Sequence, residues 1–289
     1  MNSFDTTTIR KSKFAERWER GYSSLAAGDV PRIRSQINPS FVPSGISGFI
    51  LNKGDHVALF IEEDDIDYLP VLEKFLIAGY RSSSKPEILS LELSRTENAA
   101  PVKERMMAKL GRNFSDTIEI RDVDQNYSDY EPEHFTIEGM WDAMNHERRR
   151  FSRDESQHSF RCASEDCSLF LRWVDNPREY LRYESRLAQD LENIVCKGSV
   201  QLCAFRHSVL REMESIGKLN ASIAVGEILA SHSRVILLTH EQIVFDDLAR
   251  AIIEREFPLC TKDRLAIKAH SIISRISAKL TPKSRLICS

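Results

Sequence analysis

Residues 54–65 read GDHVALFIEEDD, and the class of fold can be inferred from the pattern of this stretch. Its centre, Val57–Ile61, is a continuous apolar run of the kind found in strands that are buried on both faces of a sheet. The acidic run Glu62–Asp65 follows, and Tyr68–Gly79 then has the pattern of a helix that ends at glycine. A buried strand that ends at polar residues and leads into a helix is typical of the start of a nucleotide-binding α/β domain.

Strands and helices continue to alternate as far as about Thr239. The further strands that the apolar pattern predicts are 87–93, 118–123, 168–174, 200–205 and 235–238. The further helices that it predicts are 102–110, 133–151, 176–194, 208–213 and 221–231. Because parallel strands need crossover connections, this alternation predicts an α/β fold with a mostly parallel sheet and helices on both faces.

Helical patterns also flank the predicted sheet. Residues 9–27 have an amphipathic pattern, and the stretch 38–45, which is rich in turn formers, reads as a linker or a docking strap. The C-terminal helices that we expect are 245–257 and 262–280. The expected organisation is an N-terminal helix and linker at 1–50, an α/β domain at 51–242 and a C-terminal helical extension at 243–289. The terminal helices would serve as packing, output or dimerisation elements, so a homodimer is one expected arrangement.

Charge and hydropathy narrow the class of protein. The formal net charge of -3 gives no overall attraction to nucleic acid or to anionic lipid. No apolar run reaches the roughly 18 residues that a transmembrane helix needs. Residues 1–10 also lack the basic-then-apolar order of a signal peptide. We therefore expect a cytoplasmic protein that binds neither a membrane nor nucleic acid directly.

The 6 cysteines lie in or beside apolar stretches, which favours reduced thiols over a disulfide framework. Metal binding is the alternative. Cys162 and Cys167 follow His158 along the chain, and Cys203 precedes His207. Because no paired C-x-x-C spacing occurs, the sequence predicts no metal site.

The sequence also lacks the motifs of common enzymes. No G-x-x-x-x-G-K-[ST] phosphate loop occurs after the first strand or elsewhere. In its place, Glu62–Asp65 would repel a triphosphate at short range. No G-x-S-x-G elbow and no H-E-x-x-H pair is present. We therefore predict a protein that is not an enzyme, and the sequence identifies no cofactor.

Several blocks occur in a characteristic order: 55–60, 68–79, YESRL at 183–187, LCAF at 202–205 and ILASHSRVIL at 228–237. Together they resemble the MEDS sensory domain found in methanogen and methylotroph regulators, over roughly residues 50–242. The resemblance implies a fold similar to RecA-like and KaiC-like ATPase domains, without a working phosphate loop. It also implies a domain that senses small molecules, often hydrocarbon derivatives, for a DNA-binding or signalling partner. Arg206 stands where the family more often has an acidic residue, which points to a different ligand chemistry.

We interpret the chain as a non-enzymatic sensory module that binds a small ligand or a regulatory protein at the carboxyl edge of the sheet. The acidic run and His56 would line the mouth of this site. The predicted ligand-binding residues are His56, Glu62, Glu63, Asp64, Tyr183, Glu184, Cys203, Phe205 and Arg206. The structural alternative is core packing for the histidine, the tyrosine and the thiol, and a solvated loop for the acidic run.

A second functional class stays open. The chain could be a degenerate RecA-like nucleotide-binding protein or NTPase with an unusual phosphate grip. In that case Arg172, Arg206 or Arg234 would hold the phosphates, because a guanidinium binds phosphate oxygens in a bidentate manner.

Overall fold

The computed structural model describes residues 41–82, 88–93, 99–111, 118–122, 160–169, 171, 180–181, 183–184 and 200–269. The helices expected at 9–27 and 133–151 lie outside the described residues.

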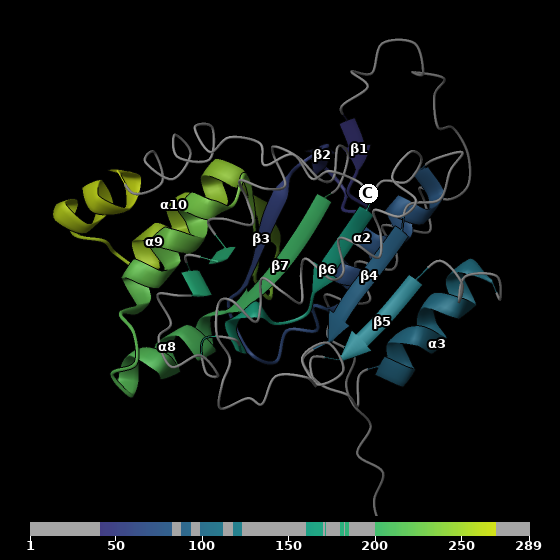
Figure 1. Ribbon diagram of the computed structural model, residues 1–289, viewed down its shortest axis with the longest axis horizontal. Helices are drawn as coiled ribbons and strands as arrows, with labels where there is room; N and C mark the ends of the chain where they lie inside the picture. The colour runs from purple at the N-terminus through teal and green to yellow at the C-terminus, as the bar shows by residue number, and fades with distance from the viewer. Residues whose placement is uncertain are drawn as a thin grey trace, which may run out of the picture.

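A seven-stranded sheet forms the centre of the described fold, in the order β5-β4-β6-β7-β3-β8-β9 (Figure 1). Its strands are β3 (His56–Ile61), β4 (Ile88–Leu93), β5 (Ile118–Asp122), β6 (Phe160–Ser164), β7 (Val200–Arg206), β8 (Arg234–Leu238) and β9 (Ile243–Phe245). All neighbouring pairs from β5 to β8 are parallel, and only β9 runs antiparallel to its neighbour. The predicted, mostly parallel α/β sheet is therefore confirmed.

Helices cover both faces of this sheet. They are α2 (Leu69–Ser82), α3 (Ala99–Leu110), α8 (His207–Ser215), α9 (Ala221–Ser231) and α10 (Asp246–Glu256). Alternate residues of β3 point to opposite faces: Val57 and Leu59 join the core under α2 and α3, whereas Ala58 and Phe60 join the core under α8, α9 and α10. Figure 1 shows α8, α9 and α10 gathered beside β3 and β7, with α3 beside β5. No helix in the described part of the chain is long and apolar enough to cross a bilayer.

One strand lies earlier than the sequence predicted. The fourth parallel strand in the chain is β6, and the stretch expected to form it, 168–174, is not a strand where it is described. Residues 167–169 form a 3₁₀ turn (η4, Cys167–Leu169), and Leu171 is helical and fully buried. A short apolar run fits a buried helix as well as a strand, so periodicity alone could not decide between them.

A buried arginine concealed the true strand. Arg161 of β6 is fully buried, and its guanidinium lies 4.8 Å from the centre of the Phe75 ring. Its Nη1 donates hydrogen bonds to the carbonyl oxygens of Pro43, at 2.8 Å, and of Phe75, at 2.9 Å. These bonds offset the cost of burying the charge in the core. A charged residue in the middle of a strand breaks the apolar pattern on which the prediction depended.

Of the linker or docking strap predicted at 38–45, the structure describes residues 41–45. Phe41–Pro43 forms strand β1, which pairs antiparallel with β2 (Ile50–Asn52). Val42 and Leu51 are buried in the core beneath α2. Residues 41–43 are therefore the first strand of a small hairpin that packs against α2 and the core.

Candidate functional site

The predicted site residues fall into two groups, one buried on a face of the sheet and one at the carboxyl ends of its strands. His56 is the first residue of β3, whereas Glu62 follows its last residue. The prediction that His56 lies with Glu62–Asp65 at the mouth of one site was therefore wrong about its position. His56, Glu184 and Cys203 instead lie together on the face of the sheet that α9 covers.

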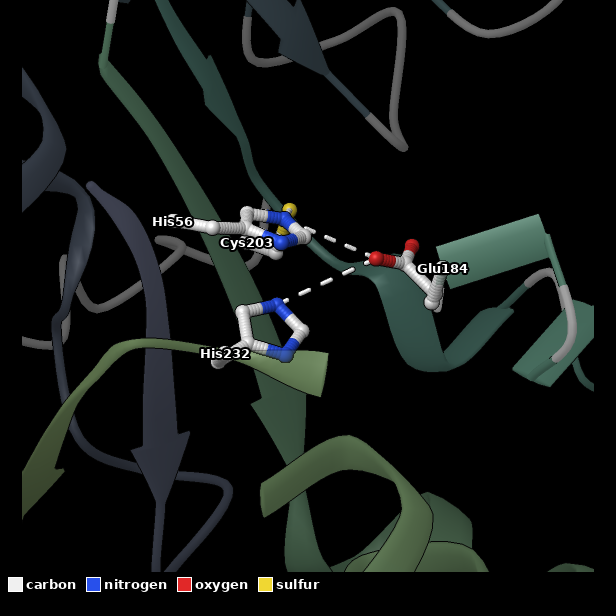
Figure 2. Close-up of side chains that lie close together, drawn as sticks. All are labelled: His56, Glu184, Cys203 and His232. Carbon is white, nitrogen blue, oxygen red and sulfur yellow. Dashed lines mark hydrogen bonds and ion pairs between the residues drawn. The ribbon is translucent and has the colours of Figure 1, made fainter. Parts of the chain in front are cut away.

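Four side chains from separate elements make up the buried cluster: His56, Glu184, Cys203 and His232 (Figure 2). His56 comes from β3, Cys203 from β7, Glu184 from a helical stretch, and His232 caps the C-terminal end of α9. All four are buried, and one nitrogen, oxygen or sulfur atom of each lies within 4.8 Å of those of the other three. The sequence had not singled out His232.

The contacts inside the buried cluster are close. His56 Nε2 lies 3.3 Å from Cys203 Sγ and 3.6 Å from Glu184 Oε2. His232 Nε2 lies 3.8 Å from the same Glu184 oxygen. The two imidazole rings stack with their centroids 3.8 Å apart. Figure 2 shows both imidazoles directed toward Glu184, with the Cys203 sulfur beside His56.

The end of α9 fixes the orientation of His232. Its Nδ1 lies 2.8 Å from the Ile228 carbonyl oxygen and 3.0 Å from Ser231 Oγ. Because a carbonyl oxygen only accepts hydrogen bonds, this contact assigns the proton of a neutral ring to Nδ1 and leaves a lone pair on Nε2. The ring of Phe205, a predicted site residue, meets His232 edge-on at 5.5 Å between centroids. Phe205 therefore supports the cluster by packing.

Burial keeps the two imidazoles and the thiol of the cluster uncharged. It lowers the pKa of His56 to about 3, partly opposed by a hydrogen bond with the Ser231 backbone. Burial, and then the neighbouring His56, hold the pKa of His232 well below its ordinary value. Burial also raises the pKa of the Cys203 thiol well above its ordinary value. At neutral pH both imidazoles are thus neutral, and the sulfur carries its proton.

A tyrosine orients the carboxylate of the buried cluster. The Tyr180 hydroxyl donates a hydrogen bond to Glu184 Oε1, so Oε2 faces the two imidazoles. Tyr180 and Glu184 are four residues apart, which places them on one face of a helix. Tyr183, the tyrosine that the sequence predicted, stacks on the Tyr180 ring instead. A Y-x-x-x-E spacing within a predicted helix was the signal that could have identified Tyr180.

The histidine–cysteine pairings suggested by sequence spacing do not form this cluster. His207 is not a member of the cluster, and its Nδ1 lies 3.2 Å from Glu256 Oε2 on α10. His158 lies outside the described residues. Imidazole nitrogen, thiolate sulfur and carboxylate oxygen are nevertheless the groups that hold zinc-class metals. The buried cluster therefore has the ligand types and the spacing to hold a metal ion.

The second group lies at the carboxyl edge of the sheet, between β3 and β7. The helices that follow these neighbouring strands, α2 and α8, pack on opposite faces, and such a switch point is where open α/β sheets bind ligands. Arg206 Nε lies 3.2 Å from Asp166 Oδ2 and 3.6 Å from Asp64 Oδ1. Ser208 Oγ also donates to Asp64 at 2.5 Å. The structure thus brings Asp64 and Arg206 together, and adds Asp166.

Most of the acidic run is exposed to solvent. Glu62 is half-buried, and its backbone N–H donates to the Leu238 carbonyl at 3.1 Å. Glu63 is exposed, and its carboxylate lies 2.6 Å from His240 Nε2, which is also 2.9 Å from Asp65. These contacts match a solvated loop, and exposed ion pairs of this kind contribute little to stability.

The arginines proposed for phosphate binding are paired with carboxylates where they are described. Arg206 lies between the two aspartates of the carboxyl edge. Arg234 donates to Asp246 from Nε, at 2.9 Å, and from Nη2, at 2.6 Å, and lies 3.5 Å from Asp55. Arg172 lies outside the described residues. Neither described guanidinium is poised to bind a phosphate without first breaking an ion pair.

Comparison with known proteins adds a likeness of fold. No family model and no curated protein matches the chain. A solved ATP synthase subunit, NeqB from Nanoarchaeum equitans, is similar with a TM-score of 0.49 and 11% identity, over 85% of this chain and 64% of that one. A KaiC-like protein from Pyrococcus horikoshii has a TM-score of 0.43 and 15% identity, over 68% of this chain and 80% of that one. Because both TM-scores are below 0.5, neither indicates what this chain binds or does, and the resemblance to MEDS domains stays a prediction.

Proposed function

We propose that the protein is a non-enzymatic sensory module that binds a ligand in the buried cluster of His56, Glu184, Cys203 and His232. The observation that carries this proposal is the convergence of four polar side chains from four elements in the core of the α/β domain. The resemblance to MEDS sensory domains supports it. The proposed site differs from the sequence-based expectation, because it lies away from the carboxyl edge.

The buried cluster is costly to the protein without a ligand. His232 Nε2 makes no hydrogen bond, although the side chain is fully buried. An unsatisfied buried polar atom costs about 1–3 kcal/mol. Local costs of this kind concentrate at functional sites, because a ligand supplies the missing interactions. Core packing alone would be served better by apolar side chains of similar size.

Contacts around His232 supply a route from the buried cluster to the C-terminal part of the chain. Arg250 of α10 donates to the carbonyl oxygens of Leu229, at 2.7 Å, and His232, at 2.8 Å, at the end of α9. Gly226 also lies on α9, and a side chain at this position would meet Leu259 and Ile267. The segment after α10 therefore packs closely against α9. We propose that ligand binding shifts the end of α9 and that Arg250 transmits this shift to α10. A regulatory protein or a second copy of the chain would then read the change.

The alternative, a degenerate nucleotide-binding protein, has one supporting observation, the switch point between β3 and β7. Two observations oppose it. Arg206 is already paired with Asp166 and Asp64, and the exposed acidic run at this edge would repel a triphosphate. We therefore place the ligand in the buried cluster, and the absence of enzyme motifs supports a non-catalytic role.

Hydrogen exchange of the full chain, read by mass spectrometry, tests the proposal. The probes are Zn²⁺, Mg²⁺–ATP and a set of short-chain alcohols and aldehydes. We expect at least one probe to slow exchange in β3 and β7 and also to change exchange in α10. In Arg250→Ala the same probe should still protect the strands, but its effect on α10 should be lost.

Arg255→Ala is the matched control, because Arg255 is an exposed arginine of the same helix. This variant should respond to the probe as the wild type does. The proposal fails if no probe protects the buried cluster, or if a bound probe leaves α10 unchanged in the wild type. Protection by Mg²⁺–ATP at the carboxyl edge alone would favour the nucleotide-binding alternative.

A further inference from the structure

We infer that the ligand of the buried cluster is a divalent metal ion of the zinc class, held by His56 Nε2, His232 Nε2, Cys203 Sγ and Glu184 Oε2. This inference rests on the proposed function, because it concerns the same site. It adds the chemical class of the ligand. A tetrahedral ion in the space between these atoms would have two nitrogen ligands, one sulfur ligand and one oxygen ligand.

Three of the six distances between the candidate ligand atoms are close to those of such an ion, and the other three are no more than 4.8 Å. Zinc bonds are about 2.0–2.3 Å long, so the ligand atoms of a tetrahedral site lie roughly 3.3–3.6 Å apart. In the buried cluster, His56 Nε2 is 3.3 Å from the Cys203 sulfur and 3.6 Å from Glu184 Oε2. His232 Nε2 is 3.8 Å from the same oxygen, and all four atoms lie within 4.8 Å of one another. Because the two imidazoles stack with their centroids 3.8 Å apart, at least one ring has to rotate out of the stack before both Nε2 lone pairs can point at one ion.

The direction of the lone pairs also calls for a cation. The bond from His232 Nδ1 to the Ile228 carbonyl leaves the lone pair of Nε2 facing Glu184 Oε2. Two electron-rich atoms that face each other in the core repel unless a proton or a metal ion lies between them. At 3.8 Å the two atoms are too far apart to share a proton in a hydrogen bond. A metal ion at bonding distance from both removes the repulsion and satisfies the buried nitrogen.

Neighbouring residues hold the ligand groups as the outer contacts of metal sites do. The Tyr180 hydroxyl donates to Glu184, and Gln201 Nε2 lies 3.5 Å from the Cys203 sulfur, to which it donates. The Ile228 carbonyl accepts from His232 on the side away from the cluster. In metal proteins such contacts fix the tautomer of a histidine ligand and the rotation of a carboxylate ligand. The cluster therefore has orienting contacts on three of its four members.

The ligand types select the metal. Magnesium and calcium prefer six or more oxygen ligands, whereas the buried cluster offers one oxygen. Cys203 becomes a thiolate by releasing its proton to solvent when the ion binds. Two imidazoles and a thiolate favour zinc and the neighbouring transition metals. Four protein ligands fill a tetrahedral ion, which is the arrangement of sites that stabilise structure rather than sites that activate water. A closed site of this kind agrees with a non-catalytic role.

Cobalt(II) titration of the chelator-stripped full chain tests the inference, because tetrahedral Co²⁺ absorbs strongly in the visible range and a thiolate ligand adds a charge-transfer band. We expect one Co²⁺ per chain, displaced by one equivalent of Zn²⁺. In Cys203→Ala the charge-transfer band should disappear. Loss of an outer contact typically lowers metal affinity by about 10–100-fold, and we expect the Co²⁺ affinity of this variant to fall by more than that. Cys162→Ala is the matched control, since this thiol is also buried and lies outside the cluster.

Glu184→Gln provides a second variant of nearly the same shape, in case Cys203→Ala does not fold. It should keep the charge-transfer band and bind Co²⁺ more weakly. The inference is wrong if the wild type binds no Co²⁺ or Zn²⁺, or if Cys162→Ala removes the band while Cys203→Ala does not. If Zn²⁺ binds but hydrogen exchange in α10 is unchanged, the metal site is supported and the sensory function is refuted. If an organic ligand changes exchange in α10 and no metal binds, the sensory function is supported and the metal site is refuted.

Discussion

At the scale of single residues, Tyr180 controls the geometry of the buried cluster. Its hydroxyl donates to one oxygen of Glu184 and so turns the other oxygen toward the two histidines. The side chain is fully buried, and burial is the main cause that raises the pKa of its hydroxyl well above the ordinary value. The hydroxyl therefore keeps its proton and stays a donor at neutral pH.

Tyr180→Phe removes this donor and keeps the ring. We expect zinc affinity to fall by about 10–100-fold, as is typical when an outer contact of a metal ligand is lost. Competition with a coloured chelator measures this change. Tyr183→Phe is the control, because it removes the same atom from the ring that stacks on Tyr180. Equal losses in both variants would show that Tyr180 does not orient the carboxylate.

Asp166, at the carboxyl edge, gives the protein a predictable pH dependence. Burial raises the pKa of Asp166 from 3.8 to about 6, opposed by hydrogen bonds from Ser168 and by Arg206, while Glu165 raises it further. Because the folded state binds this proton more tightly than the unfolded state, the stabilisation is complete below pH about 3.8 and is lost as the pH rises through about 6.

Asp166→Asn removes the titration. Between pH about 4 and about 7, we expect the free energy of unfolding of the variant to rise by about 1–3 kcal/mol relative to that of the wild type. Urea denaturation at several pH values measures the difference. If the free energy of unfolding of the variant instead falls relative to that of the wild type as the pH rises, the pairing of Asp166 with Arg206 outweighs the effect of burial.

Sequence reasoning found part of the buried cluster and could not find the rest. His56, Glu184 and Cys203 lie in blocks that resemble a known sensory domain, so they were predicted as site residues. His232 lies in such a block too, but nothing local marks it as a neighbour of His56. Metal sites are recognised in a sequence by short spacings, and the members of this cluster are far apart in the chain. Only the fold brings them together.

At the scale of elements, the end of α9 joins the proposed site to α10. The last carbonyl groups of a helix lack partners within the helix. Arg250 supplies two of these partners, the hydrogen bonds to Leu229 and His232, from a helix that packs beside α9. One guanidinium therefore caps the helix that carries His232.

Arg250→Ala should destabilise the protein by about 1.5–3 kcal/mol, which is the range for hydrogen bonds that involve a charged group. Arg255→Ala, on the exposed side of α10, should change stability by less than about 0.5 kcal/mol. Urea denaturation of both variants measures the difference. If Arg250→Ala is as mild as the control, the contact between α9 and α10 is too weak to act as a relay.

The elements were predictable where an apolar run is bounded by turn formers, as for β7, α9 and β8. The prediction failed where a polar residue is buried for a tertiary reason. Arg161 lies inside β6 because Pro43 and Phe75, from distant parts of the chain, accept its hydrogen bonds. The apolar stretch 168–174, which follows β6 in the chain, was therefore predicted as the strand in place of β6.

At the scale of the whole molecule, the alternation of strands and helices was enough to predict a mostly parallel sheet covered on both faces. It did not predict the order of the strands. Strand β3 lies between β7 and β8, next to strands that follow it much later in the sequence. This order brings His56 of β3 beside Cys203 of β7, and the start of β8 brings His232 to the same place. The buried cluster is therefore a product of the topology.

This topology, we propose, builds a metal site in the core. X-ray absorption at the zinc edge of the zinc-loaded full chain would identify the ligands of that site. We predict one sulfur ligand at about 2.3 Å and three nitrogen or oxygen ligands at about 2.0–2.2 Å, with the sulfur lost in Cys203→Ala. A spectrum with no sulfur ligand, or with six oxygen ligands, would contradict the claim.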